Sequence, residues 1–239
     1  MASLKTIVTP REDASTRIHL FDRDCNSQTT PTIFVVDNDV SVRSSLELLI
    51  CAAGWRAETF GSANEFLARP RTAGPCCLIL DVVLLDLSGL ELQRQIASER
   101  KEMPIIFLSS CCDFETTVKA MKAGALDFLT KPMNVVSILN ATREAIGRSE
   151  SLIRRETELH QIRSSYGSLT PREREVMTLV VSGLPNKLVG GELGISEITV
   201  KMHRGNLMRK MNAGSFAQLV NMASRLRVTR LLRPSAVSA

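Results

Sequence analysis

The segment TIFVVDNDVSVR, residues 32–43, joins an apolar run to a cluster of acidic and amide side chains. Five apolar or β-branched residues, Thr32–Val36, lead directly into Asp37, Asn38 and Asp39. A short apolar run bounded by polar residues is typical of a buried strand that ends at the rim of a sheet. Clustered carboxylates at such a rim repel one another unless a cation neutralises them, so this rim is the first candidate site.

Four more apolar segments follow the first at regular intervals. They give strand candidates at Trp55–Phe60, Cys77–Leu80, Pro104–Leu108 and Leu126–Leu129. Helix-period segments lie between them, and the apolar faces of two are marked by Val42, Leu46, Leu49 and Ile50, and by Phe114, Val118 and Met121. This alternation predicts an α/β domain with a doubly wound, five-stranded parallel sheet covered on both faces. Ligands of such folds bind at the carboxyl ends of the strands.

Composition is that of an ordinary globular protein. The chain has 239 residues, of which 44% are hydrophobic and 23% charged, enough for one large domain or two ordinary ones. No apolar run approaches the ~20 residues that span a bilayer. Residues 1–20 lack the apolar core of a signal peptide. The six cysteines form no CxxC pair and are expected to be reduced thiols. We therefore expect a cytoplasmic protein with no membrane partner.

Charge is distributed unevenly along the chain. From Ser168 to the end there are 11 Lys and Arg against 4 Glu and no Asp, a net charge of +7. The whole chain carries +5, so residues 1–167 carry −2. A basic carboxyl-terminal part predicts a polyanionic partner. Residues 1–30 are polar and aperiodic, which indicates a flexible extension, and residues 225–239 form a basic tail.

The second half of the chain reads as helical. A helix pattern begins near Met133 and continues past Ile146 into a weak coiled-coil stripe formed by Leu152, Leu159, Ile162, Tyr166 and Leu169. Thr170, Pro171 and Glu173 then make a capping box for a helix that ends near Val181. A short helix, NKLVGGEL, stops at Gly194, and Ser196 caps a basic helix, SEITVKMHRGNLMRKM. Two such helices joined by a glycine turn indicate a helix-turn-helix.

Polar side chains also follow the other predicted strands. The run CCLILD ends in Asp81, PIIFLSS carries Ser109, and DFLTKP adds Lys131. Because the carboxyl ends of parallel strands meet at one edge, we expect these groups to lie beside Asp37. Two carboxylates and a hydroxyl favour a divalent cation such as Mg²⁺, which often brings a phosphate. An aspartate can itself attack phosphorus.

Four motifs in order, VVDND, LILDVVLLDLSGLEL, PIIFLSS and KAGALDFLTKP, resemble the receiver domain of bacterial two-component response regulators. The resemblance implies that Asp81 is the phospho-acceptor and that a histidine kinase is the phosphate donor. It implies that Ser109 binds the phosphoryl oxygens, that Lys131 neutralises the acyl phosphate, and that Phe128 is the aromatic switch residue. It places Mg²⁺ at Asp37, Asn38, Asp81 and Val83.

The motif LTPREREVMTLVVSGLPNK…ELGISEITVKMHRGNLMRKM resembles the LuxR-type helix-turn-helix. A receiver, a linker and this module together make the layout of NarL/FixJ response regulators. The expected division is an extension 1–30, a receiver 31–147, a helical linker 148–167, a DNA-binding domain 168–224 and a tail 225–239. The resemblance implies a non-enzymatic regulator that binds double-stranded DNA as a homodimer, with RNA polymerase as a further partner.

Helical spacing divides the basic helix into an inward face and an outward face. Val200, His203, Leu207 and Met211 would pack inward, while Lys201, Arg204, Gly205 and Met208 would face away. Lys201 and the adjacent Met202 are best placed for base edges, and Arg204 for a base or a phosphate. Phosphate contacts, which position a protein without specifying sequence, are expected from Lys187, Arg209 and Lys210.

Departures from the family pattern include Asn38 and a pair of glycines, and two vicinal cysteine pairs raise the separate question of a redox or metal site. Asn38 stands where the family usually has a metal-ligating Asp, so Mg²⁺ is expected to bind weakly unless Asp39 compensates. Gly190 and Gly191 lie inside a predicted helix, at ~1 kcal/mol each relative to Ala. The vicinal pairs Cys76–Cys77 and Cys111–Cys112 flank opposite ends of their strands, so they cannot share a metal.

Two alternatives remain open. One is a phosphorylation-independent DNA-binding regulator that keeps the receiver fold and loses the switch. The other is an aspartyl phosphatase of the haloacid-dehalogenase type, which would use Asp37 and Asp39. Ser41 misses the last position of that motif, and Asp81 would have no role.

Overall fold

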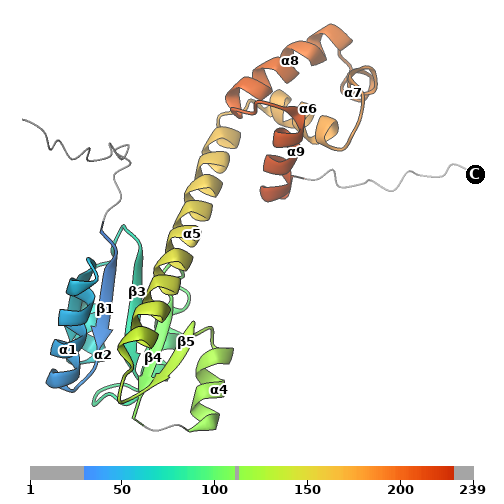
Figure 1. Cartoon of the computed structure of the whole chain (residues 1–239). Helices are drawn as coiled ribbons and strands as arrows, with labels where there is room; N and C mark the ends of the chain where they lie inside the picture. The colour runs from blue at the N-terminus through green and yellow to red at the C-terminus, as the bar shows by residue number, and fades with distance from the viewer. Residues whose placement is uncertain (1–29, 111–112, 229–239) are drawn as a thin grey trace, which may run out of the picture.

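The computed structural model describes residues 30–110 and 113–228, and its amino-terminal half is built on one parallel sheet (Figure 1). The strand order is β2-β1-β3-β4-β5. The strands are β1 (Thr32–Val36), β2 (Arg56–Phe60), β3 (Cys76–Asp81), β4 (Ile105–Ser109) and β5 (Asp127–Thr130). The predicted doubly wound α/β fold is confirmed, and each predicted strand boundary lies within one residue of the observed one.

Helices cover both faces of the sheet. They are α1 (Val40–Ala52), α2 (Ala63–Ala68), α3 (Gly89–Ile96), α4 (Phe114–Lys122) and the start of α5 (Val135–Gly167). Alternate residues of β1 enter different cores: Phe34 packs with Phe66 of α2 and Leu92 of α3. Ile33 packs on the other face, against α1 and α5. Burial on both faces explains why the strand sequences are continuously apolar.

The predicted apolar face of α4 is wrong. Phe114 is 82% exposed and Met121 is 43% exposed, whereas the small Ala120 is buried. Helix α4 lies at the edge of the sheet and contacts β5. Its buried stripe is therefore narrow. Helix spacing alone predicted that the larger apolar side chains, and not Ala120, would be buried.

One continuous helix, α5, joins the two halves of the chain (Figure 1). Its first turns bury Ile138 and Ala145 against the sheet. Ser149 ends this docking: its hydroxyl donates to the carbonyl of Glu102 at 2.6 Å and accepts from the backbone N–H of Cys76 at 3.1 Å.

The far end of α5 belongs to a different core. Ile162 and Tyr166, together with Leu169 just after the helix, pack against the carboxyl-terminal helices. These three residues were predicted to form part of a coiled-coil stripe with Leu152 and Leu159. Most of the predicted coiled-coil stripe is therefore buried inside this chain, because the small carboxyl-terminal module completes its core with the nearest apolar residues.

The carboxyl-terminal module contains α6 (Pro171–Val181), α7 (Asn186–Leu193), α8 (Glu197–Lys210) and α9 (Phe216–Arg225). The capping box of Thr170 and Glu173 is confirmed, as is the Ser196 cap of α8. Helix α9, which the sequence pattern had not singled out, closes the core with Leu219. In the described part of the chain, no helix is long and apolar enough to cross a membrane.

The two adjacent glycines of α7 have different roles. A Cβ atom on Gly190 would lie 2.7 Å from the carbonyl oxygen of Ile195, so the turn between α7 and α8 requires a glycine there. A Cβ on Gly191 would meet nothing within 4 Å. The expectation that both merely weaken the helix is wrong for Gly190, because a close backbone approach depends on it.

Candidate functional site

The acidic residues predicted at the strand ends lie together. Asp37 follows β1 and Asp81 ends β3, and both are buried. The ammonium of Lys131, just after β5, donates to Asp37 Oδ2 at 2.6 Å and to Asp81 Oδ2 at 3.0 Å. Three elements far apart in sequence thus place two carboxylates around one cation.

The remaining carboxylate oxygens are held by the backbone. Asp37 Oδ1 accepts from the N–H of Asp39 at 2.9 Å, and Asp81 Oδ1 accepts from the N–H of Val83 at 3.3 Å. Burial alone would lower the pKa of Lys131, but the hydrogen bonds and charges of the two aspartates outweigh it and raise this pKa. Lys131 is therefore a firmly charged counter-ion at the edge of the sheet.

The other two predicted receiver residues flank this cluster. Ser109 is buried at the end of β4, and its carbonyl accepts from the N–H of Lys131 at 2.8 Å. Phe128 is partly buried, and its ring centroid lies 6.1 Å from that of Phe107. Phe128 thus packs against the core on β5, the strand paired with the one that ends in Ser109.

Asn38, the neutral residue of the segment 32–43, is exposed at the carboxyl edge of the sheet. Asn38 lies between the buried Asp37 and Asp39. Asp39 caps α1, and its Oδ1 accepts from the N–H and the hydroxyl of Ser41 at 2.8 and 2.7 Å. Hydrogen bonds from the Ser41 hydroxyl and N–H lower the pKa of Asp39. Asp39 therefore serves as a helix cap, which gives no support to its use as a substitute ligand or as half of a phosphatase motif.

The donors at this rim suit a hard cation but are few. Carboxylate and amide oxygens are the ligands that Mg²⁺ prefers. Among the described residues, no three His, Cys, Asp or Glu side chains are grouped so that they could hold a metal. Two carboxylates, Asp37 and Asp81, remain, and the amide of Asn38 supplies no charge.

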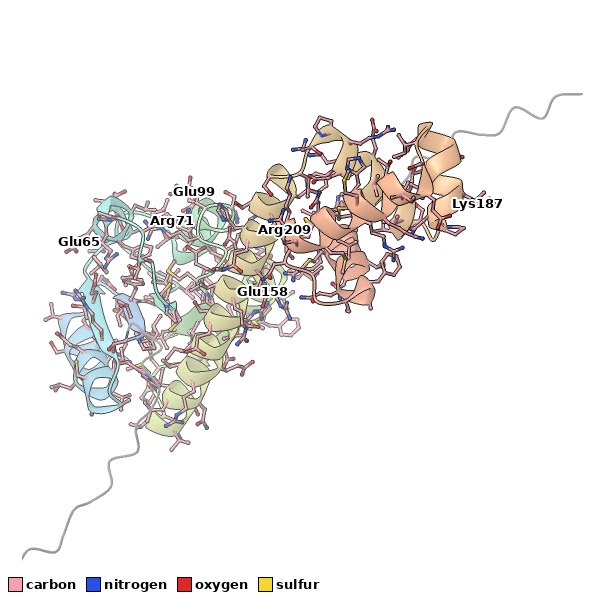
Figure 2. The ribbon with its side chains drawn as sticks, turned by 90° about the horizontal axis from the view of Figure 1, so that it is seen from above. Glu65, Arg71, Glu99, Glu158, Lys187 and Arg209 are labelled. Carbon is pink, nitrogen blue, oxygen red and sulfur yellow. The ribbon has the colours of Figure 1, made fainter. Side chains whose placement is uncertain are left out.

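The second candidate site is the exposed face of α8. Val200, Leu207 and Met211 are buried in the helical core, and His203 is half-buried. Outward-facing residues include Lys201, Met202, Gly205 and Arg209. Figure 2 shows Lys187 and Arg209 on the surface of this module.

Three residues predicted on or near that face have intramolecular partners. Arg204 donates to Asn186 Oδ1 at 2.9 Å and stacks 4.9 Å above the Phe216 ring. Met208 packs against the core. Lys210 donates to Glu173 Oε2 at 2.7 Å. The prediction that Arg204 and Met208 face freely away is wrong, because α7 and α9 provide contacts that helix spacing cannot show.

Comparisons with known proteins match both halves of the chain. Residues 33–143 match the family model of the response regulator receiver domain, and residues 167–223 match that of the luxR family of bacterial regulatory proteins. Nodulation protein W of Bradyrhizobium diazoefficiens is 41% identical over 203 residues, covering 85% of this chain and 89% of that protein. This chain is a NarL/FixJ-family response regulator.

Other response regulators of this family are similar along both modules. Response regulator protein TmoT of Ectopseudomonas mendocina is 40% identical, covering 82% of this chain and 89% of that protein. The low-resolution structure of response regulator StyR is 42% identical with a TM-score of 0.73, covering 82% of this chain and 100% of that chain. The family is one of DNA-binding transcriptional regulators rather than of enzymes, and its receiver domains typically bind Mg²⁺.

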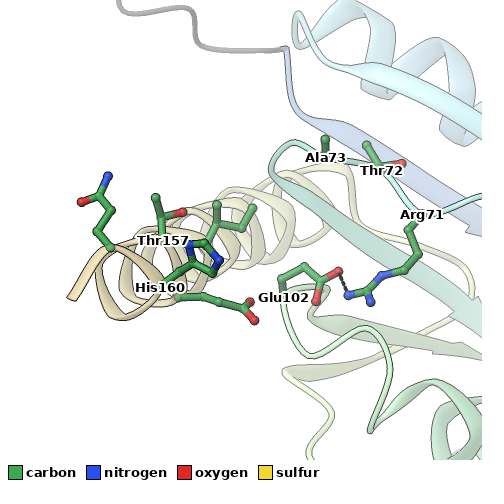
Figure 3. A pocket seen from close by; sticks show the side chains of 9 residues that line it. Arg71, Thr72, Ala73, Glu102, Thr157 and His160 are labelled. Carbon is green, nitrogen blue, oxygen red and sulfur yellow. Dashed lines mark hydrogen bonds and ion pairs between the residues drawn. The ribbon is translucent and has the colours of Figure 1, made fainter. Parts of the chain in front are cut away.

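Sequence reasoning missed two features of this response regulator. Asp86, in the loop after Asp81, accepts from the N–H groups of Ala63 and Asn64 and so caps α2. A cavity of about 470 Å³ lies between α5 and the receiver (Figure 3). The 2.8 Å ion pair of Arg71 and Glu102 lines it on the receiver side. Neither feature leaves a local sequence signal, because the partners are distant in the chain.

The cysteine pairs give no redox site in the described residues. Burial raises the pKa of Cys76 to about 11, and burial raises that of Cys77 further. Neither is a reactive thiolate at neutral pH. Cys25, Cys111 and Cys112 lie outside the described residues.

Lys210→Ala should destabilise the helical module by about 2 kcal/mol, because it leaves the buried Glu173 carboxylate without its cation. Burial alone would raise the pKa of Glu173, but bonds from Lys210 and Thr170 outweigh it, so the folded-state pKa is lowered. The stabilisation is therefore present above the unfolded-state pKa and is lost as pH falls through the folded-state pKa. Thermal unfolding from neutral to acidic pH measures both effects.

The exposed neighbour on α8 provides the control. Arg209→Ala should leave the unfolding temperature unchanged, since no described carboxylate pairs with Arg209. Equal destabilisation by the two variants would show that the Lys210–Glu173 contact has no special structural role.

Proposed function

We propose that Asp81 accepts a phosphoryl group from a histidine kinase and that this modification controls DNA binding and transcription. The observation that carries the proposal is the buried Asp37–Lys131–Asp81 cluster at the carboxyl edge of the sheet. In the transfer, an Asp81 carboxylate oxygen bonds to phosphorus while the nitrogen–phosphorus bond of the donor histidine breaks. Phos-tag electrophoresis with Mg²⁺ and acetyl phosphate tests it.

The neighbouring residues have assigned roles in this proposal. Asp37, Asn38, Asp81 and the Val83 backbone would hold Mg²⁺, which would supply positive charge beside the phosphoryl oxygens. Lys131 exchanges one carboxylate partner for the phosphoryl group. Ser109 binds a phosphoryl oxygen, and Phe128 changes its packing when Ser109 does.

A second candidate is a regulator that works without phosphate. One observation favours it: Lys131 already forms an ion pair with each of the two buried carboxylates, and Asn38 adds no negative charge to attract a metal. If Phos-tag gels show no modified band although DNA binding is intact, this candidate replaces the first.

For DNA binding we propose that α8 enters the major groove. Lys201 and Met202 reach base edges, Gly205 lies on the same face, and Lys187 and Arg209 contact phosphates. Arg204 and Lys210 reach DNA only by leaving Asn186 and Glu173. The exposed basic residues of α8 and the net charge of +7 on residues 168–239 support this assignment.

Lys201→Ala should weaken specific binding by about 1–3 kcal/mol and relax base preference. Lys201 pairs with Glu197 at 3.0 Å, an exposed contact that contributes little to stability, so the module should fold normally. Gel shifts with a selected and a scrambled duplex measure the effect. Wild-type affinity that is the same for both duplexes would contradict sequence-specific binding.

We further propose a cytoplasmic, non-enzymatic regulator with RNA polymerase as a partner and the domain division 1–30, 31–147, 148–167, 168–224 and 225–239. Residues 1–29 and 229–239 lie outside the described residues. The active form is a homodimer that reads two half-sites. Light scattering of the phosphorylated protein on its selected duplex should give two chains per duplex; one chain per duplex would exclude the dimer.

A further inference from the structure

Helix α8 carries two large apolar side chains that no part of the described chain covers. Ile198 is 78% exposed and Met202 is 56% exposed. They are four residues apart, so they lie next to each other on one face of the helix. The inward face of the same helix already supplies the core with Val200 and Leu207. An additional exposed apolar pair is therefore not explained by folding.

The surroundings of this pair indicate its occupant. Lys201 lies between Ile198 and Met202 in sequence, and Arg209 lies two turns beyond Met202 on the same side. Lys187 of α7 is also exposed. An apolar strip with cationic neighbours matches duplex DNA, whose phosphates flank a major groove that contains thymine methyl groups.

Gly205 gives an independent observation. It lies one turn beyond Met202, it is exposed, and a Cβ atom there would meet nothing within 4 Å. The fold therefore does not require glycine, although glycine is a poor residue for a helix interior. A bare backbone at this point allows close approach by a partner.

We propose that α8 reads thymine 5-methyl groups through Ile198 and Met202, with Gly205 as the point of closest approach to the duplex. This inference rests on the proposed DNA binding and adds the chemical group that is recognised. Thymine is the base that presents a methyl group in the major groove. A half-site recognised in this way contains thymines opposite the Ile198–Met202 pair.

Uracil substitution tests the inference, because deoxyuridine keeps the hydrogen-bonding groups of thymidine and lacks only the methyl. The full-length protein is used to select a duplex from a random library, and each thymidine is then replaced in turn. We expect a loss of about fourfold in affinity at one or two positions per half-site, as for one buried methyl-sized group. Ile198→Ala should bind the thymidine duplex about fourfold more weakly and should no longer distinguish uracil at one of those positions.

Leu48 provides a matched control, since it is an aliphatic residue of α1 that is 74% exposed on the receiver. Leu48→Ala should keep the wild-type thymine-to-uracil ratio. Gly205→Ala should raise the unfolding temperature yet weaken binding to the selected duplex severalfold.

Two results would overturn the inference. The first is uracil neutrality at every position in a duplex that wild type still selects over scrambled sequence. The second is an equal loss by Ile198→Ala on thymidine and uracil duplexes, which would make Ile198 a positioning residue. Equal wild-type affinity for selected and scrambled duplexes would instead contradict the proposed function, and this inference with it.

Discussion

Labelling by acetyl phosphate should disappear in Asp81→Asn and should become faster in Asn38→Asp. The first result follows because the amide oxygen of asparagine is not a nucleophile comparable to a carboxylate. Asp81 is buried at the end of β3, and its Oδ2 lies 3.0 Å from the Lys131 ammonium. Asp37 is the one other described carboxylate that pairs with Lys131. The double variant should also remain unlabelled.

The effect of Asn38→Asp follows from charge. Two unit charges ~4 Å apart interact by roughly 4 kcal/mol at an effective dielectric near 20. Desolvation and repulsion from Asp37 and Asp81 cancel much of this gain. A residual ~1.4 kcal/mol would still tighten Mg²⁺ binding about tenfold. Magnesium titrations followed by labelling time courses at saturating metal separate affinity from rate.

Asp39→Asn is the matched control for charge at this rim. Asparagine is about as good an N-cap as aspartate, so the α1 cap should be kept. Because the Asp39 carboxylate already accepts from Ser41, the lost charge should leave Mg²⁺ affinity nearly unchanged. If Asn38→Asp changes neither affinity nor rate while Asp39→Asn lowers both, Asp39 is the ligand and the assignment of Asn38 is wrong.

Gly190→Ala should destabilise the helical module by about 2 kcal/mol, while Gly191→Ala should stabilise it by up to ~1 kcal/mol. Both changes add the same methyl group to the same helix. At Gly190 the methyl meets the backbone carbonyl of Ile195 and one of the two segments must move, whereas at Gly191 it meets open space. The sign of the effect should therefore reverse between adjacent residues.

Far-ultraviolet circular dichroism during thermal unfolding of the full chain measures this difference. The chain has one tryptophan, Trp55, which packs in the receiver, so its fluorescence serves as an internal control. Both variants should leave the fluorescence transition in place. Destabilisation of similar size in the two variants would mean that helix softness, and not the turn, limits the stability of α7.

The sequence was most informative where structure depends on neighbouring residues. Apolar runs located the strands because burial on both faces leaves a continuous signal, and the caps at Thr170 and Ser196 were readable because their partners lie three residues away. The convergence of Asp37, Asp81 and Lys131 followed from parallel strand topology alone.

Contacts between distant segments were not readable. Lys210 and Glu173 are 37 residues apart, and Arg204 meets Asn186 across a turn. The sequence therefore could not distinguish an intramolecular partner from an exposed side chain that contacts DNA. The need for Gly190 depends on where the Ile195 carbonyl lies. In each case the deciding quantity is a distance between elements that only the folded chain defines.

Because α5 is one continuous helix, its length sets the rotation of the carboxyl-terminal module about the helix axis. Between Ser149 and Ile162 no residue of this helix is fully buried, so that span connects two cores without belonging to either. Each residue of an α-helix adds about 100° of rotation and ~1.5 Å of rise. Inserting one residue there would turn α8 about 100° away from its present direction, whereas inserting seven would restore it to within about 20°. The number of residues in this span, and not their composition, therefore sets the direction in which α8 points.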